Sequence, residues 1–333
     1  MGIRIMWRAA SAPLLLALSL WASASTASRT PKVVFIIVDG VPADTLEQVS
    51  TPHIDALAEE GGYARAQVGG LVGTPAETPT VSAPGYMSLI TGTWADKHNV
   101  RDNYDLAPNY DYWNIFRLAL TVKPELSTGI FSTWRDNRTV LVGEGLTEAG
   151  DIHIRYVVDG LEDDTERFPH QPMDAHIALI DEYVAAQAAA AIELSGPDLS
   201  WVYLQYTDDI GHEFGDSPEM DAAITVMDGL IGKIWASVKQ RRALNPEEDW
   251  LILVTTDHGR DAEGREHEFQ SERERMIWIA TNSQRLTPAF YEQPEIVDIY
   301  PSIANHLGLT MPDSVRAGLD GKSFIKEQPH GDE

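Results

Sequence analysis

Long unbroken runs of hydrophobic residues recur along this chain at the length of single β-strands. The clearest covers residues 32–38, which are mostly β-branched and lead directly into Asp39-Gly40. Continuous apolar runs, without alternation, are typical of strands buried on both faces of a parallel sheet. The same pattern predicts further strands at 127–132, 197–206, 249–256 and 276–280.

Helical patterns alternate with these strands. Thr51, Pro52 and Gly61 mark the start and end of one helix, and residues 218–239 place apolar side chains on one face. Further helices are expected at 86–90, 174–194 and 296–307. The alternation predicts an α/β fold: a doubly wound, mostly parallel sheet flanked by helices, with the functional site at the carboxyl ends of its strands.

The chain divides into four parts by composition. Residues 1–24 have the features of a secretory signal peptide: Arg4 and Arg8, an apolar stretch, and small residues for cleavage within 22–28. Residues 25–31 are expected to be a linker, 32–325 a single catalytic domain with a substrate-facing insertion at about 104–198, and 326–333 a polar tail. The apolar stretch is short for a bilayer span, so we expect an exported, periplasmic or secreted protein without a stable membrane anchor, with an uncleaved anchor as the alternative.

Charge narrows the possible partners. The 25 basic and 51 acidic residues give a net charge of −26, and loss of Arg4 and Arg8 would leave 23 basic residues and a charge of −28. This acidity argues against a nucleic-acid polymer or an anionic membrane as partner, but it is compatible with a small phosphorylated substrate. Cysteine is absent, which excludes a thiol nucleophile and thiolate metal ligands. The sequence does not specify an oligomeric state.

Six potential metal ligands and one hydroxyl stand out. Ser82 lies where a turn-forming segment enters a helix, and the six side chains are at or beyond the ends of strand-like runs: Asp39, Asp208, His212, Asp257, His258 and His267. Taken singly, each has an ordinary alternative, such as a helix cap, a turn or a solvated histidine. Together they can hold two divalent cations and activate the serine, which predicts a two-metal phosphoesterase.

These residues occur in an order that resembles the alkaline phosphatase superfamily, and most of all its nucleotide pyrophosphatase/phosphodiesterase branch. The resemblance rests on Asp39, the Thr80-Val-Ser-Ala-Pro-Gly85 motif, Asn103, Asp208 with His212, Asp257-His-Gly259, and His267. It runs from about residue 32 to residue 323.

The resemblance implies a role for each residue. Asp208, His212 and His267 would bind one zinc ion; Asp39, Asp257 and His258 would bind the other, together with the nucleophile Ser82. Asn103 and the backbone N–H groups near Ser82 would hold a phosphoryl oxygen. The implied reaction is a double displacement through a covalent phospho-serine.

Three departures from the branch bear on this interpretation. Ser82 stands where the branch usually has threonine, and Gly85 stands where it often has asparagine. His267 follows Asp257 by ten residues, a spacing more like phosphopentomutases, which makes Mn²⁺ an alternative to Zn²⁺. Sulfatases need an arginine four residues after the nucleophile, where this chain has Tyr86, so a sulfatase nucleophile is not expected.

Candidate substrate contacts are Arg135, Arg138 and Tyr104. Either arginine could contact the substrate phosphate, or both could form a salt-bridged turn. Tyr104 could stack on a nucleobase or aryl group, or pack within the insertion. We expect hydrolysis of phosphodiesters or nucleotide pyrophosphates. The alternatives are a monoesterase of the same superfamily and a secreted metal-binding protein without turnover.

Overall fold

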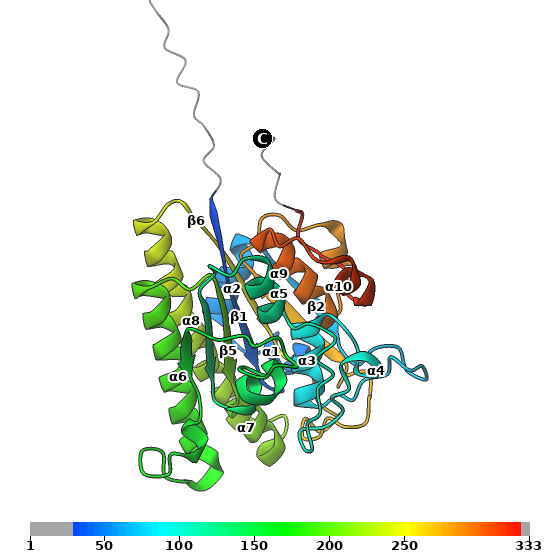
Figure 1. Cartoon of the computed structure of the whole chain (residues 1–333). Coiled ribbons are helices and arrows are strands. Elements are labelled where there is room, and N and C mark those ends of the chain that lie inside the picture. The colour runs from blue at the N-terminus through cyan, green and yellow to red at the C-terminus, as the bar shows by residue number, and fades with distance from the viewer. Residues whose placement is uncertain (1–28, 328–333) are drawn as a thin grey trace, which may run out of the picture.

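The computed structural model describes residues 29–327, which form a seven-stranded sheet in the order β2-β7-β6-β1-β5-β3-β4 (Figure 1). All neighbouring strands are parallel except that β7 is antiparallel to β2 and to β6. The predicted α/β fold with a mostly parallel sheet is therefore confirmed. The strands are β1 (Thr30–Val38), β2 (Gly62–Gln67), β3 (Thr128–Ser132), β4 (Tyr156–Val158), β5 (Leu199–Leu204), β6 (Glu248–Thr255) and β7 (Met276–Thr281).

Helices cover both faces of the sheet (Figure 1). One layer contains α1 (Ala43–Leu46), α2 (Pro52–Glu60), α6 (Ala175–Leu194) and α8 (Pro218–Leu244), and the other contains α3 (Ser82–Thr91), α5 (Ile115–Val122), α9 (Ile299–Leu307) and α10 (Asp313–Gly318). The remaining helices are α4 (Ala95–His98), α7 (Tyr206–Phe214), the π-helix η1 (Asn137–Val142), and the 3₁₀-helices η2 (Leu161–Asp163), η3 (Pro172–Asp174), η4 (Pro288–Tyr291) and η5 (Ile296–Asp298).

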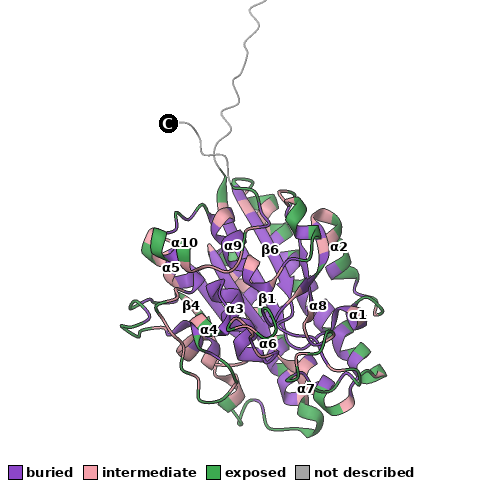
Figure 2. Ribbon diagram, turned by 90° about the vertical axis from the view of Figure 1, so that its right-hand side faces the viewer, coloured by how far each residue is buried: buried purple, intermediate pink, exposed green. Residues whose placement is uncertain are grey.

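The central strand explains why its sequence is apolar without alternation. Val34 and Ile36 of β1 pack in the core under α2, α6 and α8, whereas Phe35 and Ile37 pack in the core under α3, α5 and α9. All four side chains are almost completely buried, and Figure 2 shows the central strands β1 and β6 mostly in the colour of buried residues. Two hydrophobic layers therefore stabilise the strand from opposite sides.

Strand register places the ends of three strands next to one another. β1 pairs with β5 so that Val38 lies opposite Leu204, and it pairs with β6 so that Ile37 lies opposite Thr255. The residues that follow these strands therefore meet at one edge of the sheet. In open parallel sheets this carboxyl edge is where ligands bind.

The structure describes only part of the two ends of the chain. The predicted signal peptide (1–24), the first part of the linker and residues 328–333 lie outside the described residues. Thr30 and Pro31, expected in the linker, already belong to β1. Among residues 29–327, no helix has the length and apolar character needed to cross a membrane.

Some elements differ from the prediction. β2, β4 and α5 were not predicted, and the helix expected at 296–307 consists of η5 followed by α9. Residues 104–198, predicted to be a substrate-facing insertion, supply β3, β4, α5 and α6 to the layers of the fold. The connections between these elements contain η1, η2 and η3.

Candidate active site

Ser82 is the first residue of α3, and its side chain is directed into the carboxyl edge of the sheet. The residue is 6% exposed, and its Oγ lies 3.4 Å from Nε2 of His258. Gly85 in the same helical turn allows this approach, because a Cβ there would come within 2.8 Å of the backbone oxygen of Asp257. A larger residue at this position would push the helix away from Asp257.

Asp39, Asp257 and His258 form the buried part of the site. Asp39 follows β1, and the other two residues follow β6 after Thr256. His258 Nε2 lies 3.4 Å from Oδ1 of Asp39 and 3.3 Å from Oδ2 of Asp257. The backbone N–H of Gly40 donates to the other oxygen of Asp257 at 3.1 Å, which ties the loop after β1 to the loop after β6.

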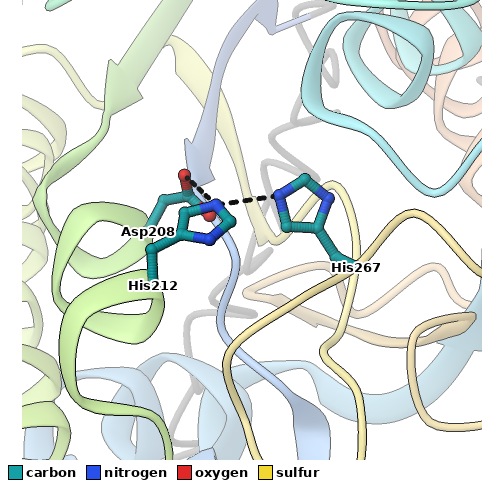
Figure 3. A group of neighbouring side chains, drawn as sticks. All are labelled: Asp208, His212 and His267. Atoms are coloured by element: carbon teal, nitrogen blue, oxygen red, sulfur yellow. Dashed lines mark hydrogen bonds and ion pairs between the residues drawn. The ribbon is translucent and has the colours of Figure 1, made fainter.

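Asp208, His212 and His267 form the second, more exposed part (Figure 3). Asp208 and His212 lie one turn apart on α7, with His212 Nε2 3.4 Å from Asp208 Oδ2. His267 comes from the long connection between β6 and β7, and its Nε2 lies 3.0 Å from Nε2 of His212. The structure therefore brings all six predicted ligands and Ser82 to one edge of the sheet.

The arrangement concentrates negative charge. Burial and the nearby charge of Asp39 raise the pKa of Asp257 well above its ordinary value. Burial disfavours the imidazolium of His258, but the carboxylates of Asp257 and Asp39 outweigh this effect and raise its pKa to about 9. Burial also disfavours the carboxylate of Asp208, yet the Arg260 guanidinium lowers its pKa below the usual range. The surroundings therefore favour positive charge beside Asp39 and Asp257.

The donor atoms fit divalent cations. Two groups of three side chains bring their ligand atoms within 4.8 Å of one another: Asp208, His212 and His267, and Asp39, Asp208 and His258. Asp39 Oδ1 and Asp257 Oδ2 are buried and have no hydrogen-bond partner among residues 29–327. Unpaired carboxylate oxygens are costly to bury unless a cation or donor joins them. Asp208 belongs to both groups, which the sequence did not predict.

Both buried histidines are oriented by the backbone. His258 Nδ1 lies 2.9 Å from the carbonyl oxygen of Gly259, and His267 Nδ1 lies 2.8 Å from that of Thr80. An N–H at Nδ1 can donate to a carbonyl, so in the neutral form of each ring Nε2 is the acceptor. Backbone contacts of this kind are usual for histidines that bind metals.

A pocket of about 220 Å³ opens beside Ser82. Asn103 lines it and accepts a hydrogen bond at Oδ1 from the backbone N–H of Ala83 at 2.8 Å, so this N–H is already used. Tyr104 also contributes to the lining and is 80% exposed. The full lining consists of Asp39, Ser82, Tyr86, Asn103, Tyr104, Trp134, Tyr203, Gln205 and Asp208.

Neither predicted arginine lines this pocket. Arg135 pairs with Asp163, while Arg138 lies 2.5 Å from both Asp159 and Glu144. These contacts correspond to the salt-bridged turn that was the alternative interpretation of the segment.

Sequence reasoning missed several residues that support the site. Tyr86 and Tyr203 both donate hydrogen bonds to Asp39 Oδ2, and Trp134 and Gln205 line the pocket. Burial, together with the charge of Asp39, raises the pKa of both tyrosines well above the usual range. One signal was present, since Tyr86 follows Ser82 by four residues and thus lies on the same face of α3.

Arg260 lies in the β6–β7 connection and ties it to the turn after β1 and to the first turn of α7. Its Nε donates to the carbonyl of Gly40 at 2.8 Å, and its two Nη atoms donate to the carbonyls of Asp208 and Arg265 at 2.9 Å each. It also pairs with the Asp208 carboxylate, and only 1% of the residue is exposed. A buried arginine with all these partners fixes Asp208 relative to β1.

Together, the fold and the side chains at its edge define an α/β protein whose carboxylates and imidazoles fit divalent cations beside a serine hydroxyl. The family model described as type I phosphodiesterase / nucleotide pyrophosphatase matches residues 33–302. The chain belongs to this family.

Curated relatives agree with this assignment. Human ectonucleotide pyrophosphatase/phosphodiesterase family member 7 is 25% identical over 247 residues, which cover 68% of this chain and 47% of the relative. The rat protein of the same name is 22% identical over 250 residues, covering 68% of this chain and 49% of the relative. The chain therefore spans about half the length of the curated relatives it matches.

Solved structures show the same fold. Human ectonucleotide pyrophosphatase/phosphodiesterase 5 matches with a TM-score of 0.60 and 15% identity, covering 84% of this chain and 96% of that one. An inactive form of the murine protein, solved with AMP, matches with a TM-score of 0.57 and 16% identity, covering 85% and 96%. A 2-O GAG sulfatase matches with a TM-score of 0.61 and 12% identity, covering 88% of this chain and 73% of that one. The fold alone therefore does not separate phosphodiesterases from sulfatases.

The role of Arg260 can be tested by its replacement with methionine, which keeps much of the side-chain volume. We expect Arg260→Met to lower the free energy of unfolding by about 3–5 kcal/mol, because the Asp208 carboxylate loses its buried partner. Urea denaturation in the presence of a chelator measures this. Arg65→Met, which removes an exposed ion pair with Glu47, is the control and should lower the free energy of unfolding by at most about 1 kcal/mol. Equal effects of the two substitutions would contradict the assigned role.

Proposed function

We propose that this chain is a metal-dependent phosphoric ester hydrolase that cleaves phosphodiesters or nucleotide pyrophosphates, with Ser82 as the nucleophile. The observation that carries the proposal is the position of the Ser82 hydroxyl, 3.4 Å from His258 Nε2 and at the same edge as three aspartates and two further histidines. Membership of the phosphodiesterase family supports the same reaction class.

Two divalent cations are part of the proposal. Asp208, His212 and His267 would hold one, and Asp39, Asp257 and His258 would hold the other beside Ser82. Such ions would lower the pKa of the serine hydroxyl and neutralise charge on the leaving oxygen. Three imidazole donors favour Zn²⁺, while the carboxylates also suit Mn²⁺.

The protein side chains would carry the reaction in two displacements. In the first, the Ser82 hydroxyl loses its proton, Oγ forms a bond to phosphorus, the bond from phosphorus to the leaving oxygen breaks, and that oxygen takes up a proton. In the second, water attacks phosphorus, the bond to Ser82 Oγ breaks, and the hydroxyl is restored. The N-terminus of α3, where Ser82 lies, favours the negative charge of the phosphoryl group throughout.

Asn103 would position the phosphoryl group. The Ala83 N–H holds Oδ1 of this residue, so Nδ2 is the donor that Asn103 offers to the pocket it lines. Tyr104 and Trp134, which line the same pocket, offer aromatic surfaces to a nucleobase or aryl group. The substrate would be a small phosphorylated molecule, not a nucleic-acid polymer.

The lining residues favour diesters over monoesters. No lysine or arginine of residues 29–327 lines the pocket, whereas Asp39 and Asp208 do. A monoester carries one more negative charge than a diester near neutral pH, and this extra charge would have no side-chain cation to pair with. Arg135 and Arg138 were proposed for that task, but both are held by carboxylates.

Export is also part of the proposal. It rests on the predicted signal peptide at 1–24 and on the names of the curated relatives, which describe ectoenzymes. The mature protein would act in the periplasm or in the surrounding medium.

Replacement of Ser82 by alanine tests the nucleophile. We expect Ser82→Ala to lower kcat/KM for an aryl phosphodiester by roughly 10³-fold or more, because no other hydroxyl replaces the attacking oxygen. The control is Ser88→Ala in the same helix, whose hydroxyl donates to the Pro84 carbonyl. Its turnover should stay close to that of the wild type. Near-normal turnover by Ser82→Ala, with metal content unchanged, would contradict the mechanism.

The charge of the pocket predicts a substrate preference. We expect kcat/KM for an aryl diester to exceed that for the matching aryl monoester by at least about tenfold, since hydrogen bonds to charged groups contribute about 1.5–3 kcal/mol and the monoester would lack one. Tyr104→Arg should narrow this ratio, and Tyr104→Phe should leave it unchanged. A wild-type protein that prefers the monoester would favour the alternative monoesterase.

A further inference from the structure

The carboxylate of Asp39 has two oxygens in very different surroundings. Oδ2 accepts hydrogen bonds from two phenols, one from Tyr86 on α3 and one from Tyr203 on β5, the latter at 2.6 Å. Oδ1 is buried without a hydrogen-bond partner among the described residues and lies 3.4 Å from His258 Nε2. One oxygen is therefore saturated by donors, and the other is left to the metal-binding edge.

We propose that Tyr86 and Tyr203 are positioning residues that fix the Asp39 carboxylate so that it offers only Oδ1 to a divalent cation. This inference rests on the proposed function, because it assumes that Asp39 is a metal ligand.

The two phenols are held rigidly by their neighbours. Both tyrosines are buried, and their rings meet edge to face with centroids 5.0 Å apart. Tyr86 also contacts the rings of Trp134 and Trp201, with centroid distances of 6.2 and 6.3 Å. Because aromatic pairs of this geometry restrict ring motion, neither hydroxyl can leave Asp39 without disturbing the core.

The pair also connects the nucleophile to the metal ligand. Tyr86 lies one helical turn after Ser82, so its hydrogen bond ties α3 to the residue that follows β1. Tyr203 ties the same carboxylate to β5, five residues before Asp208, which lies in the first turn of α7. The orientation of Asp39 thereby depends on two elements that also position Ser82 and Asp208.

Loss of these hydrogen bonds would free the carboxylate. Without the phenols, Oδ2 would be a second unpaired buried oxygen, and the group could rotate to place both oxygens on a cation. Groups that orient a metal ligand typically affect metal affinity by 10- to 100-fold when removed. The effect should be confined to the cation beside Asp39, because both phenols donate to Asp39 and no hydrogen bond joins either tyrosine to His212 or His267 among the described residues.

The test measures metal binding by the full-length protein after chelator treatment. Zn²⁺ is titrated into the wild type, Tyr86→Phe, Tyr203→Phe and the double variant, with His258→Ala and His212→Ala used to assign the two binding events. We expect each Phe variant to weaken the event lost in His258→Ala by about 10- to 100-fold and to leave the other unchanged. When Co²⁺ replaces Zn²⁺, the visible spectrum of each Phe variant should differ from that of the wild type. In the same variants, kcat for an aryl diester should fall while KM stays nearly constant.

Tyr300→Phe is the matched control. Tyr300 is a fully buried tyrosine of α9 whose hydroxyl has no hydrogen-bond partner among residues 29–327, so its removal should change neither the affinity nor the Co²⁺ spectrum. Circular dichroism checks folding, and if one of the two variants does not fold, the other decides, because both phenols reach the same oxygen.

The outcomes separate this inference from the proposed function. A wild type that binds no Zn²⁺ would overturn the proposed function itself. A wild type that binds two ions, with Tyr86→Phe and Tyr203→Phe matching Tyr300→Phe in affinity and spectrum, would overturn only the role of the tyrosines.

Discussion

The structure depends on the burial of carboxylates where the central strands end. Asp39 and Asp257 are almost completely buried, and Asp208 lies close enough to share a candidate cation with Asp39. Like charges this close oppose one another's ionisation, so the group requires compensating positive charge. Arg260 supplies one permanent charge at Asp208, and the imidazole of His258 faces the other two carboxylates. Divalent cations fit these oxygens and nitrogens and would supply the rest of the positive charge.

Backbone geometry makes this concentration possible. Gly40 has a positive φ of 62°, and a Cβ there would come within 2.5 Å of Asp208 and 2.3 Å of Arg260. Glycine therefore allows the turn after β1 to pass under both side chains. On the other side of the site, Thr80 and His267 bond to each other's backbone carbonyl, which joins the segment before Ser82 to the β6–β7 connection. The nucleophile and the ligands are thus held by contacts between segments far apart in the sequence.

Much of the fold could be predicted because a strand buried on both faces has a continuous run of apolar residues. The apolar runs that became β1, β5 and β6 are typical of central strands, and the polar residues after them were expected at one edge. β2 was missed because its alternating Gly62–Gln67 segment lies at the edge of the sheet and lacks such a run. β4 has only three residues and gives a pattern too short to detect.

The meeting of the six acidic and imidazole side chains with Ser82 at one edge of the sheet could be predicted, but the contacts among them could not. Local sequence places Asp208 and His212 on one face of a helix, but it does not show that Asp208 also approaches Asp39 and His258, since that depends on strand register. In the same way, nothing local shows that Tyr203 reaches Asp39 or that Arg138 is held by Asp159 and Glu144. Such contacts are set by packing between distant segments, which one sequence does not reveal.

The central claim is that two cations occupy this edge of the sheet beside Ser82. Anomalous X-ray diffraction from crystals of the zinc-loaded protein, recorded on both sides of the zinc absorption edge, tests it most directly. The account predicts two zinc peaks, one among Asp208, His212 and His267 and the other among Asp39, Asp257, His258 and the Ser82 hydroxyl. A map with no zinc peak at this edge, or with peaks only elsewhere on the surface, would contradict it.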